Sequence, residues 1–299
     1  MKIALFSDVH GNRHALAAVL QDLGAWRPDR VIVNGDLVNR GPHSLECFER
    51  VMERAARGGW YLVRGNHESF VLRVADGEAE TAGIDYAITE FTHWTRAQLG
   101  IEAELLRDWS DELIFEGPCG GTIHATHGSM MSNRHGVYEH HSPEEMGLRV
   151  SPDADLFLTA HTHKPHGFRY RGTYAVNSGS VGTPFDGDRR ACYTRLRWDD
   201  EVWHVEHVRL PFDYAAAEAD FTTSGFMDGG GPLTRVMLAE MVQAKPLIRG
   251  WMKDYEGRVR AGELALAESV ERFLSRQAGM ATRPPRPLPL LVSRRRQPR

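Results

Sequence analysis

The chain has 299 residues, which is enough for one large domain or for one domain with appendages. Its 41% hydrophobic and 25% charged residues are typical of a globular protein, and a net charge of −4 gives no overall attraction to nucleic acid or anionic membranes. The three cysteines, Cys47, Cys119 and Cys192, form no C-x-x-C pair, which favours reduced thiols. Because no segment approaches the roughly 18 consecutive apolar residues of a membrane span, we expect a soluble, cytoplasmic protein without a membrane partner.

The first apolar run, Lys2 to Ser7, has the length of a buried strand and ends in the turn Asp8-Val-His10-Gly-Asn12. If the extended geometry persists, Asp8 and His10 project to the same side because alternate residues of a strand share a face. A carboxylate and an imidazole aimed together suit a divalent metal such as manganese, iron or zinc. A surface turn that merely contains these two residue types is the alternative.

Two further apolar runs end in the same way. The run 31–33 is followed by Asn34-Gly-Asp36, and the run 60–63 by Arg64-Gly-Asn66-His67-Glu68. Amphipathic helices are predicted between the strands, over 14–24 and 45–56. Strands and helices in alternation indicate an α/β fold, and open α/β sheets bind ligands at the carboxyl ends of their strands. We therefore expect these polar residues to converge at one edge of a sheet.

Residues 76–113 have a helical pattern with an aromatic stripe. Two interpretations stay open, because both bury the same side chains. The segment is either an inserted helical cap over the site or a helical layer packed on one face of the sheet.

The following stretch predicts more strands that end in histidines. Runs at 113–115 and 122–125 precede His127-Gly, and the run 155–159 precedes His161-Thr-His163. Alternating residues over 166–210 predict antiparallel strands. The polar loop 129–145 contains His135, Tyr138 and His140, which we expect to form a wall of the substrate site.

The domain organisation follows from these patterns. We expect a catalytic domain over 1–225 with the helical insertion 76–113, a helical C-terminal extension over 226–279, and a disordered basic tail over 280–299, which is rich in proline and arginine. Nucleic acid could contact this tail, but a merely solvated tail is the favoured interpretation. The sequence does not indicate an oligomeric state.

The ordered blocks D-x-H, G-D, G-N-H-E, H-G and H-x-H, spread over residues 3 to about 185, resemble the calcineurin-like metallophosphoesterase superfamily. The resemblance implies a four-layer β-sandwich, with two mixed sheets flanked by helices, that holds two divalent metal ions. The implied ligands are Asp8, His10 and His163 for one metal, Asn66, His127 and His161 for the other, and Asp36 as a bridge between them.

The chemistry of phosphoester hydrolysis accounts for these residue types. Two divalent ions about 3.5–4 Å apart lower the pKa of a bridging water and neutralise the phosphoryl oxygens. Manganese is the metal we favour, and iron, zinc and nickel are the alternatives. By resemblance, His67 protonates the leaving group or stabilises the transition state. The alternative is that His67 only supports the metal ligands.

Two blocks point to different branches of this superfamily. The segments 35–42 and 62–68 are similar to the Ser/Thr protein phosphatase and diadenosine tetraphosphatase branch, in which an arginine at the position of Arg40 grips the phosphate. Arg64 and Asn12 are further candidates for phosphate contacts. Asn39 stands where that branch has the aspartate that pairs with the catalytic histidine. The segments 160–165 and 176–182 instead look like the small bacterial and archaeal phosphodiesterase branch, although Ala160 stands where glycine is usual.

The sequence therefore predicts a metal-dependent phosphoesterase that hydrolyses phosphate monoesters of a nucleotide-like or otherwise small substrate. A phosphodiesterase acting on cyclic nucleotides, dinucleoside polyphosphates or nucleic acid and a protein phosphatase are the alternative enzymes. A non-catalytic scaffold and a nuclease of DNA repair are less favoured, because every expected ligand is present and no extended basic face is visible.

Overall fold

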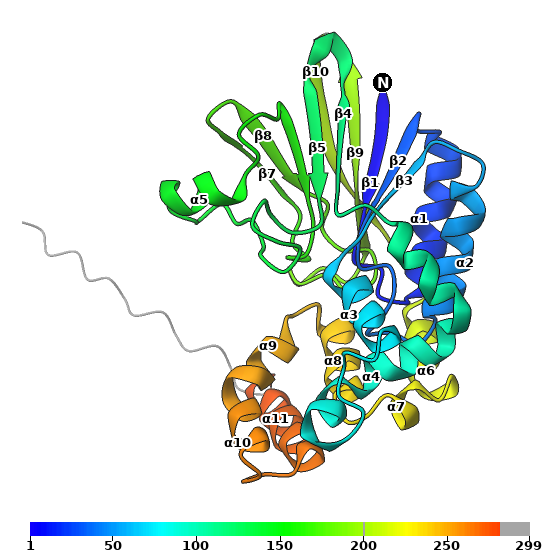
Figure 1. Cartoon of the computed structure of the whole chain (residues 1–299), viewed down its shortest axis with the longest axis vertical. Coiled ribbons are helices and arrows are strands. Elements are labelled where there is room, and N and C mark those ends of the chain that lie inside the picture. Colours follow the sequence, from blue (N-terminus) through cyan, green and yellow to red (C-terminus); the bar gives the residue numbers. More distant parts are fainter. Residues whose placement is uncertain (200, 282–299) are drawn as a thin grey trace, which may run out of the picture.

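The computed structural model describes residues 1–199 and 201–281 and contains two five-stranded sheets with helices around them (Figure 1). In the first sheet the order is β10-β9-β1-β2-β3. Strands β1 (Lys2–Phe6), β2 (Arg30–Asn34) and β3 (Trp60–Val63) are parallel, and β9 (Ala191–Asp199) and β10 (Val202–Leu210) complete the sheet as antiparallel strands.

The second sheet has the order β4-β5-β6-β8-β7. Its strands are β4 (Glu112–Glu116), β5 (Thr122–Thr126), β6 (Leu156–Thr159), β7 (His166–Tyr170) and β8 (Thr173–Asn177). The expectation of antiparallel strands from 166 to 210 is wrong in one pairing. Strand β8 is antiparallel to β7 but parallel to β6, because the β7–β8 hairpin brings β8 back beside β6 in the direction of β6.

The two sheets pack face to face, as alternation along β1 shows. Ile3 and Leu5 face the second sheet and pack with residues such as Leu158, whereas Ala4 and Phe6 face the opposite way, toward the helices. Helices α1 (Arg13–Trp26) and α2 (Ser44–Ala55) cover that outer face. On the far side, the short helix α5 (Pro143–Arg149) packs on the second sheet. The predicted layered α/β sandwich is confirmed.

Helix α4 (Gly83–Leu99) and the 3₁₀ helix η1 (Gly100–Asp108) lie within the segment 76–113 that was predicted as a cap or a layer, and helix α3 (Asn66–Ala75) precedes it. The contacts of this segment are divided between two cores. Leu99 and Leu106 join the core beneath the first sheet, while Ile88 packs with the C-terminal helices. Helix α4 therefore connects two hydrophobic cores.

The remaining helices follow β10 and have a core of their own, which includes Phe226, Trp251 and Phe273. They are α6 (Tyr214–Thr223), α7 (Phe226–Gly229), α8 (Thr234–Gln243), α9 (Leu247–Trp251), the π-helical η3 (Met252–Glu256), α10 (Gly257–Arg260) and α11 (Leu266–Ala281). Figure 1 shows that they lie beyond the carboxyl ends of the parallel strands. The domain boundary after residue 225 stays a prediction.

Two further sequence expectations concern the C-terminal tail and membrane-spanning helices. Helix α11 runs through Ala281, and the rest of the predicted tail, 282–299, lies outside the described residues. Within the described residues, none of the helices combines the length and the hydropathy needed to cross a membrane.

Candidate metal centre

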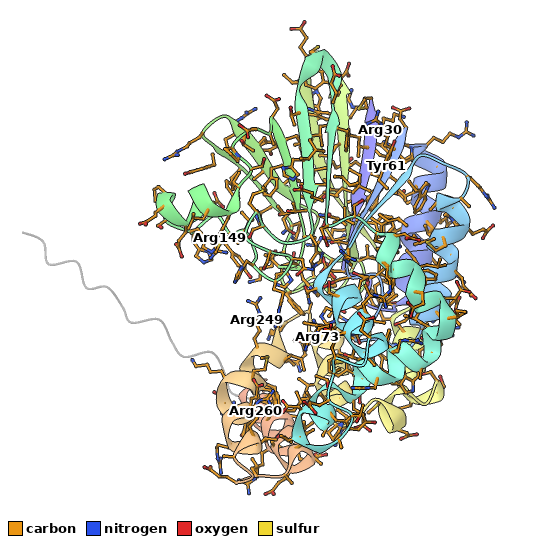
Figure 2. All side chains as sticks on the ribbon, viewed as in Figure 1. Arg30, Tyr61, Arg73, Arg149, Arg249 and Arg260 are labelled. Atoms are coloured by element: carbon orange, nitrogen blue, oxygen red, sulfur yellow. The ribbon has the colours of Figure 1, made fainter. Side chains whose placement is uncertain are left out.

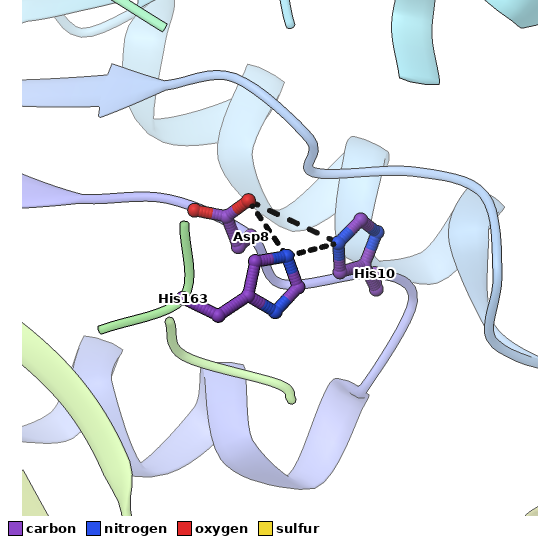
Figure 3. Close-up of side chains that lie close together, drawn as sticks. All are labelled: Asp8, His10 and His163. Atoms are coloured by element: carbon purple, nitrogen blue, oxygen red, sulfur yellow. Dashed lines mark hydrogen bonds and ion pairs between the residues drawn. The ribbon is translucent and has the colours of Figure 1, made fainter. Parts of the chain in front are cut away.

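The side chains predicted as metal ligands lie at the carboxyl ends of strands from both sheets. The loops after β1, β2, β3, β5 and β6 meet at the lower edge of the sheets in Figure 1. Asp8, His10 and His163 form one compact group (Figure 3), and Asp36, His127 and His161 form a second, each with its ligand atoms within 4.8 Å of one another. Residues from positions 8 to 163 are thus brought to one site.

Asn66 joins the second group through its side chain, because its Oδ1 lies 2.9 Å from His161 Nδ1. His10, Asp36 and His67 make a third compact group. The seven residues predicted as ligands therefore converge, and His67 lies among them. Their roles as ligands stay predictions.

Backbone strain is concentrated at this site. Asp8, His10, Asp36, His161 and His163 all have a left-handed backbone conformation, with φ between 48° and 66°. For residues other than glycine this conformation costs about 1–3 kcal/mol and tends to occur where function requires it. The folded structure around the site therefore supports five unfavourable conformations, which aim these side chains at one point.

Two glycines allow the loops to approach so closely. A Cβ atom at Gly35, whose φ is 83°, would lie 2.5 Å from His127 Nδ1. A Cβ atom at Gly65 would overlap with Asp36 Oδ1. Since real Cβ atoms do not approach other atoms so closely, any side chain at either position would push β2, β3 and β5 apart at the site.

The lone pairs of the site fit a bound cation. His127 Nδ1 lies 2.7 Å from the carbonyl oxygen of Asn34, and His163 Nδ1 lies 2.5 Å from that of Thr183. Because a carbonyl can only accept, both histidines carry their proton on Nδ1 and present a bare Nε2 to the site. His127 Nε2 then lies 3.2 Å from Asp36 Oδ2, and neither of these two hydrogen-bond acceptors carries a proton in the neutral ring.

The same conflict recurs in the first group. His163 Nε2 lies 3.2 Å from Asp8 Oδ1 and 3.3 Å from His10 Nε2. Asp8 Oδ1 and His127 Nε2 are buried and have no hydrogen-bond partner among the described residues. Buried acceptors that face one another are stabilised by a cation, either a proton or a metal ion. The residues present fit two divalent metals, one in each group, with Asp36 in reach of both.

The pKa values show which side chains bind a proton in place of a metal ion when no metal is bound. Burial lowers the pKa of His127, but the charge and hydrogen bond of Asp36 outweigh burial and raise this pKa to about 10. Burial alone would raise the pKa of Asp36, yet His127 and His67 hold it well below its usual range. Burial and the charge of Arg40 keep the pKa of His10 well below its usual value, so His10 is neutral, as a metal ligand must be.

Glu68 is a residue whose role the sequence analysis missed. Its buried carboxylate accepts the backbone N–H groups of Asp36 at 2.7 Å, Leu37 at 2.8 Å, Val38 at 3.2 Å and Gly65 at 2.8 Å. It therefore ties the loop after β2 to the loop after β3. The G-N-H-E block contained this signal, because a glutamate at the third position of helix α3 can bond back to the residue that precedes the helix.

His67 has its tautomer set by Asn39. The backbone N–H of Arg40 donates to Asn39 Oδ1 at 2.9 Å, which turns the Asn39 amide nitrogen toward His67 Nδ1, 3.0 Å away. His67 Nδ1 must therefore accept, and the ring proton is on Nε2. Burial, only partly offset by the charge of Asp36, lowers the pKa of His67 to about 3. His67 is thus a neutral donor.

The three residues predicted to contact phosphate, Arg40, Asn12 and Arg64, have different surroundings in the structure. Arg40 lines the cavity beside the metal ligands and forms an ion pair with the buried Glu240 of α8. Asn12 has both amide atoms engaged, since Oδ1 accepts from Ala15 N at 3.0 Å and Nδ2 donates to Gly182 O at 3.1 Å.

Arg64 is not brought to that cavity. Its guanidinium donates to Asp111 Oδ1 at 3.0 and 2.7 Å, and Arg64 is absent from the residues that line the space beside the ligands. This placement does not match the predicted phosphate contact. The physical reason is that the backbone N–H of Arg64 bonds Ser110 O, so the side chain starts beside the 110–111 turn, where a carboxylate is available.

A cavity of about 350 Å³ lies beside the predicted ligands, and residues of α4 and the C-terminal helices line its other walls. We call it the apolar cavity, because a continuous share of its lining residues is hydrophobic: Phe70, Ile88, Phe91, Phe185, Leu233, Met237, Ile248, Trp251 and Met252. Asp36, Asn66, His67, His161 and His163 form its floor. One end of α4 and the C-terminal helices thus cover this cavity.

Two layers of strands that deliver clustered aspartates, histidines and an asparagine define a metal-dependent phosphoesterase. Comparison with known families agrees, since residues 1–165 match the family model described as calcineurin-like phosphoesterase. The chain belongs to this family, whose members typically bind two divalent metals. The resemblance that the sequence motifs indicated is therefore confirmed.

Known relatives agree with this assignment. The chain is 26% identical to a metallophosphoesterase of Sphaerobacter thermophilus, whose crystal structure aligns with a TM-score of 0.64 over 82% of this chain and 99% of that one. It is 27% identical to an uncharacterised protein of Methanocaldococcus jannaschii over 72% of this chain and 89% of that protein. A shorter match, 32% identical, covers 35% of this chain and 40% of a symmetrical bis(5'-nucleosyl)-tetraphosphatase of Erwinia tasmaniensis.

Proposed function

We propose that this protein hydrolyses phosphate monoesters of small, nucleotide-like compounds with the help of two divalent ions, with manganese as the first candidate. The observation that carries the proposal is the pair of imidazole Nε2 atoms, on His127 and His163, that face the carboxylates of Asp36 and Asp8 while backbone carbonyls hold both Nδ1 protons. Iron, zinc and nickel accept the same nitrogen and oxygen ligands, so the donor set does not select among these metals.

The side chains around the ligands supply the other parts of such a reaction. When bound, the two ions would activate water and neutralise the phosphoryl group. The Nε2–H of His67 would donate to the oxygen of the leaving group, a role for which its fixed tautomer is suited. Arg40 would bind a phosphoryl oxygen while Glu240 holds its guanidinium in place.

The apolar cavity supports a small substrate. Its volume of about 350 Å³ lies within the range of small-molecule sites, and its aromatic walls suit the organic part of a phosphate ester. The C-terminal helices over the site would obstruct a folded protein substrate. The similarity to a protein named for cleaving bis(5'-nucleosyl) tetraphosphates also favours a nucleotide-like substrate. The same similarity supports the alternative of a dinucleoside polyphosphate substrate, which the assay below includes. No observation favours a scaffold or nuclease role over this proposal.

The test is rescue of activity by metal. After dialysis against a chelator we expect no turnover of p-nitrophenyl phosphate, and restoration by Mn²⁺ or another of the candidate ions. The bis ester and dinucleoside polyphosphates, assayed in parallel, report the subclass. If no metal restores turnover of any of these compounds, the proposal is wrong.

A matched pair of variants connects the activity to the predicted ligands. Asp36→Asn removes the carboxylate that reaches both groups, so we expect fewer than two equivalents of metal by elemental analysis and little activity. Asp111→Asn removes an exposed aspartate outside the site and should retain both. Full metal content in Asp36→Asn would exclude the bridging role.

A further inference from the structure

A second pocket opens on the other side of the predicted ligands. Its volume is about 310 Å³, and it shares His161, Phe185 and Arg249 with the apolar cavity. Phe185 stacks on His163 with the ring centroids 4.2 Å apart, so the wall between the two pockets rests on the ligand cluster itself. We call this space the basic pocket; its other lining residues are Tyr138, His140, His141, Thr162, Lys164 and Pro246.

The charge of the basic pocket is not neutralised. Lys164 and Arg249 line it, no carboxylate does, and within the described chain neither cation forms an ion pair. Arg40, in the apolar cavity, contrasts with them, because Glu240 neutralises it. Two unpaired cations in one pocket attract an anion.

A contact with Tyr138 holds the Arg249 guanidinium at the pocket. Arg249 Nη1 donates to the Tyr138 hydroxyl at 3.3 Å, and the rings of Tyr138 and His140 lie 5.3 Å apart. In Figure 2 Arg249 extends from α9 toward the sheets.

We propose that the basic pocket binds a second phosphoryl group of the substrate, while the first lies over the predicted metal ligands. This inference rests on the proposed function and makes the substrate class more specific. The ammonium of Lys164 and the guanidinium of Arg249 supply charged donors for phosphoryl oxygens, and the Tyr138 hydroxyl supplies a neutral one. The apolar cavity on the other side takes the organic group. The preferred substrates are therefore organic compounds with two phosphoryl groups.

The experiment compares ligands that differ in the second phosphoryl group. Adenosine monophosphate, adenosine diphosphate and adenosine 3′,5′-bisphosphate are used as competitors of p-nitrophenyl phosphate hydrolysis by the manganese-loaded protein. Adenosine diphosphate and the bisphosphate place their second phosphoryl group at different distances from the first. We expect at least one of them to have an inhibition constant about tenfold or more below that of the monophosphate, as expected for new hydrogen bonds to charged donors.

Variants show whether this preference comes from the basic pocket. In Lys164→Gln and in Arg249→Gln, the ratio of the inhibition constant of the monophosphate to that of the better two-phosphate ligand should fall about five- to tenfold, toward one. Lys164→Arg should restore most of the ratio. Arg171→Gln, which removes an exposed cation of the β7–β8 turn, should leave it unchanged.

Two results overturn the inference. One is that neither two-phosphate ligand binds better than the monophosphate; the other is that the ratio survives in both glutamine variants. A protein inactive on every substrate would contradict the proposed function alone. In that case the ligands are not consumed, and calorimetric dissociation constants for the same three ligands and the same variants decide the inference about the basic pocket.

Discussion

Among single side chains, His67 shows how a neighbour can set the chemistry of a residue. A carboxylate beside its Nδ1 would stabilise the imidazolium, whereas the Asn39 amide donates to Nδ1 and stabilises the neutral ring. Thr92 and Thr95 hold Asn39 through hydrogen bonds of 3.1 and 3.3 Å to its amide nitrogen and oxygen. His67 can therefore donate a hydrogen bond from Nε2, but it has little tendency to hold the second proton that a general acid would transfer.

Replacement of His67 should separate catalysis from metal binding. We expect His67→Ala to keep its metal content and to lower kcat about a hundredfold for alkyl phosphates, with a smaller loss for p-nitrophenyl phosphate, whose leaving group needs no proton. His204→Ala, an exposed histidine on β10, is the control. An equal loss on good and poor leaving groups would argue against a hydrogen bond from His67 to the leaving-group oxygen, and loss of metal would make His67 a ligand.

The sequence could predict the ligand positions because each one follows an apolar strand within a short local pattern. Asp8, Asp36 and Asn66 are recognisable from their own neighbours in the chain. The partners of Asn12 and Arg64 could not be predicted in the same way. Asn12 binds Gly182 across the fold, and Arg64 binds a carboxylate more than forty residues away. Such pairings depend on tertiary structure, which a local motif does not contain.

At the scale of elements, Asn12 caps helix α1 and so contributes to stability. Asn12→Ala should cost about 1 kcal/mol of unfolding free energy, because the N–H of Ala15 loses its acceptor, and Asn12→Ser should recover most of it. Urea denaturation gives the free energies, and the KM for p-nitrophenyl phosphate is measured on the same samples. A rise in KM without loss of stability would instead support the predicted phosphate contact.

Helix α8 is joined to the site through Glu240. This buried carboxylate pairs with Arg40 and accepts the backbone N–H of Ile248 at 2.7 Å, so it connects the loop after β2 with α8 and α9. We expect Glu240→Ala to cost about 3 kcal/mol, because Arg40 is left charged and partly buried. Glu268→Ala, which breaks an exposed ion pair of α11, should cost less than 1 kcal/mol. Comparable costs in urea denaturation would show that α8 is not held through Arg40.

At the scale of the whole molecule, the sandwich and the C-terminal helices share α4 and enclose the apolar cavity between them. The helical extension was predictable from its periodicity, but its position over the site was not. That position depends on contacts such as Arg40 with Glu240 and Ile88 with the second core, which join residues far apart in the chain. Composition and pattern define such an extension as helical without indicating which face of the molecule it covers.

The proton shared by Asp36 and His127 couples the stability of the whole fold to pH and to metal. In the metal-free protein, Asp36 outweighs burial and raises the pKa of His127 to about 10, well above the value of about 6.5 in an unfolded chain. This pair therefore stabilises the fold fully below pH 6.5 and progressively less as the pH rises toward 10. Burial and the charge of Asp36 raise the pKa of Glu68 to about 7. The contribution of Glu68 to the stability of the fold therefore also falls as the pH rises, between pH 4.5 and 7.

In the chelated protein we therefore expect the Asp36–His127 pair to contribute about 2 kcal/mol less unfolding free energy at pH 8.5 than at pH 6.5. The loss is measured as a difference from His127→Asn, because histidines with a lowered pKa, such as His10, gain stability over the same range. The manganese-loaded protein should lose much less, because a metal ion between Asp36 and His127 takes the place of the proton and is not released as the pH rises. Anaerobic urea denaturation with chelator and with Mn²⁺ makes the comparison, and His127→Asn should reduce the slope in chelator. Equal slopes with and without metal would mean that no cation binds between these two side chains.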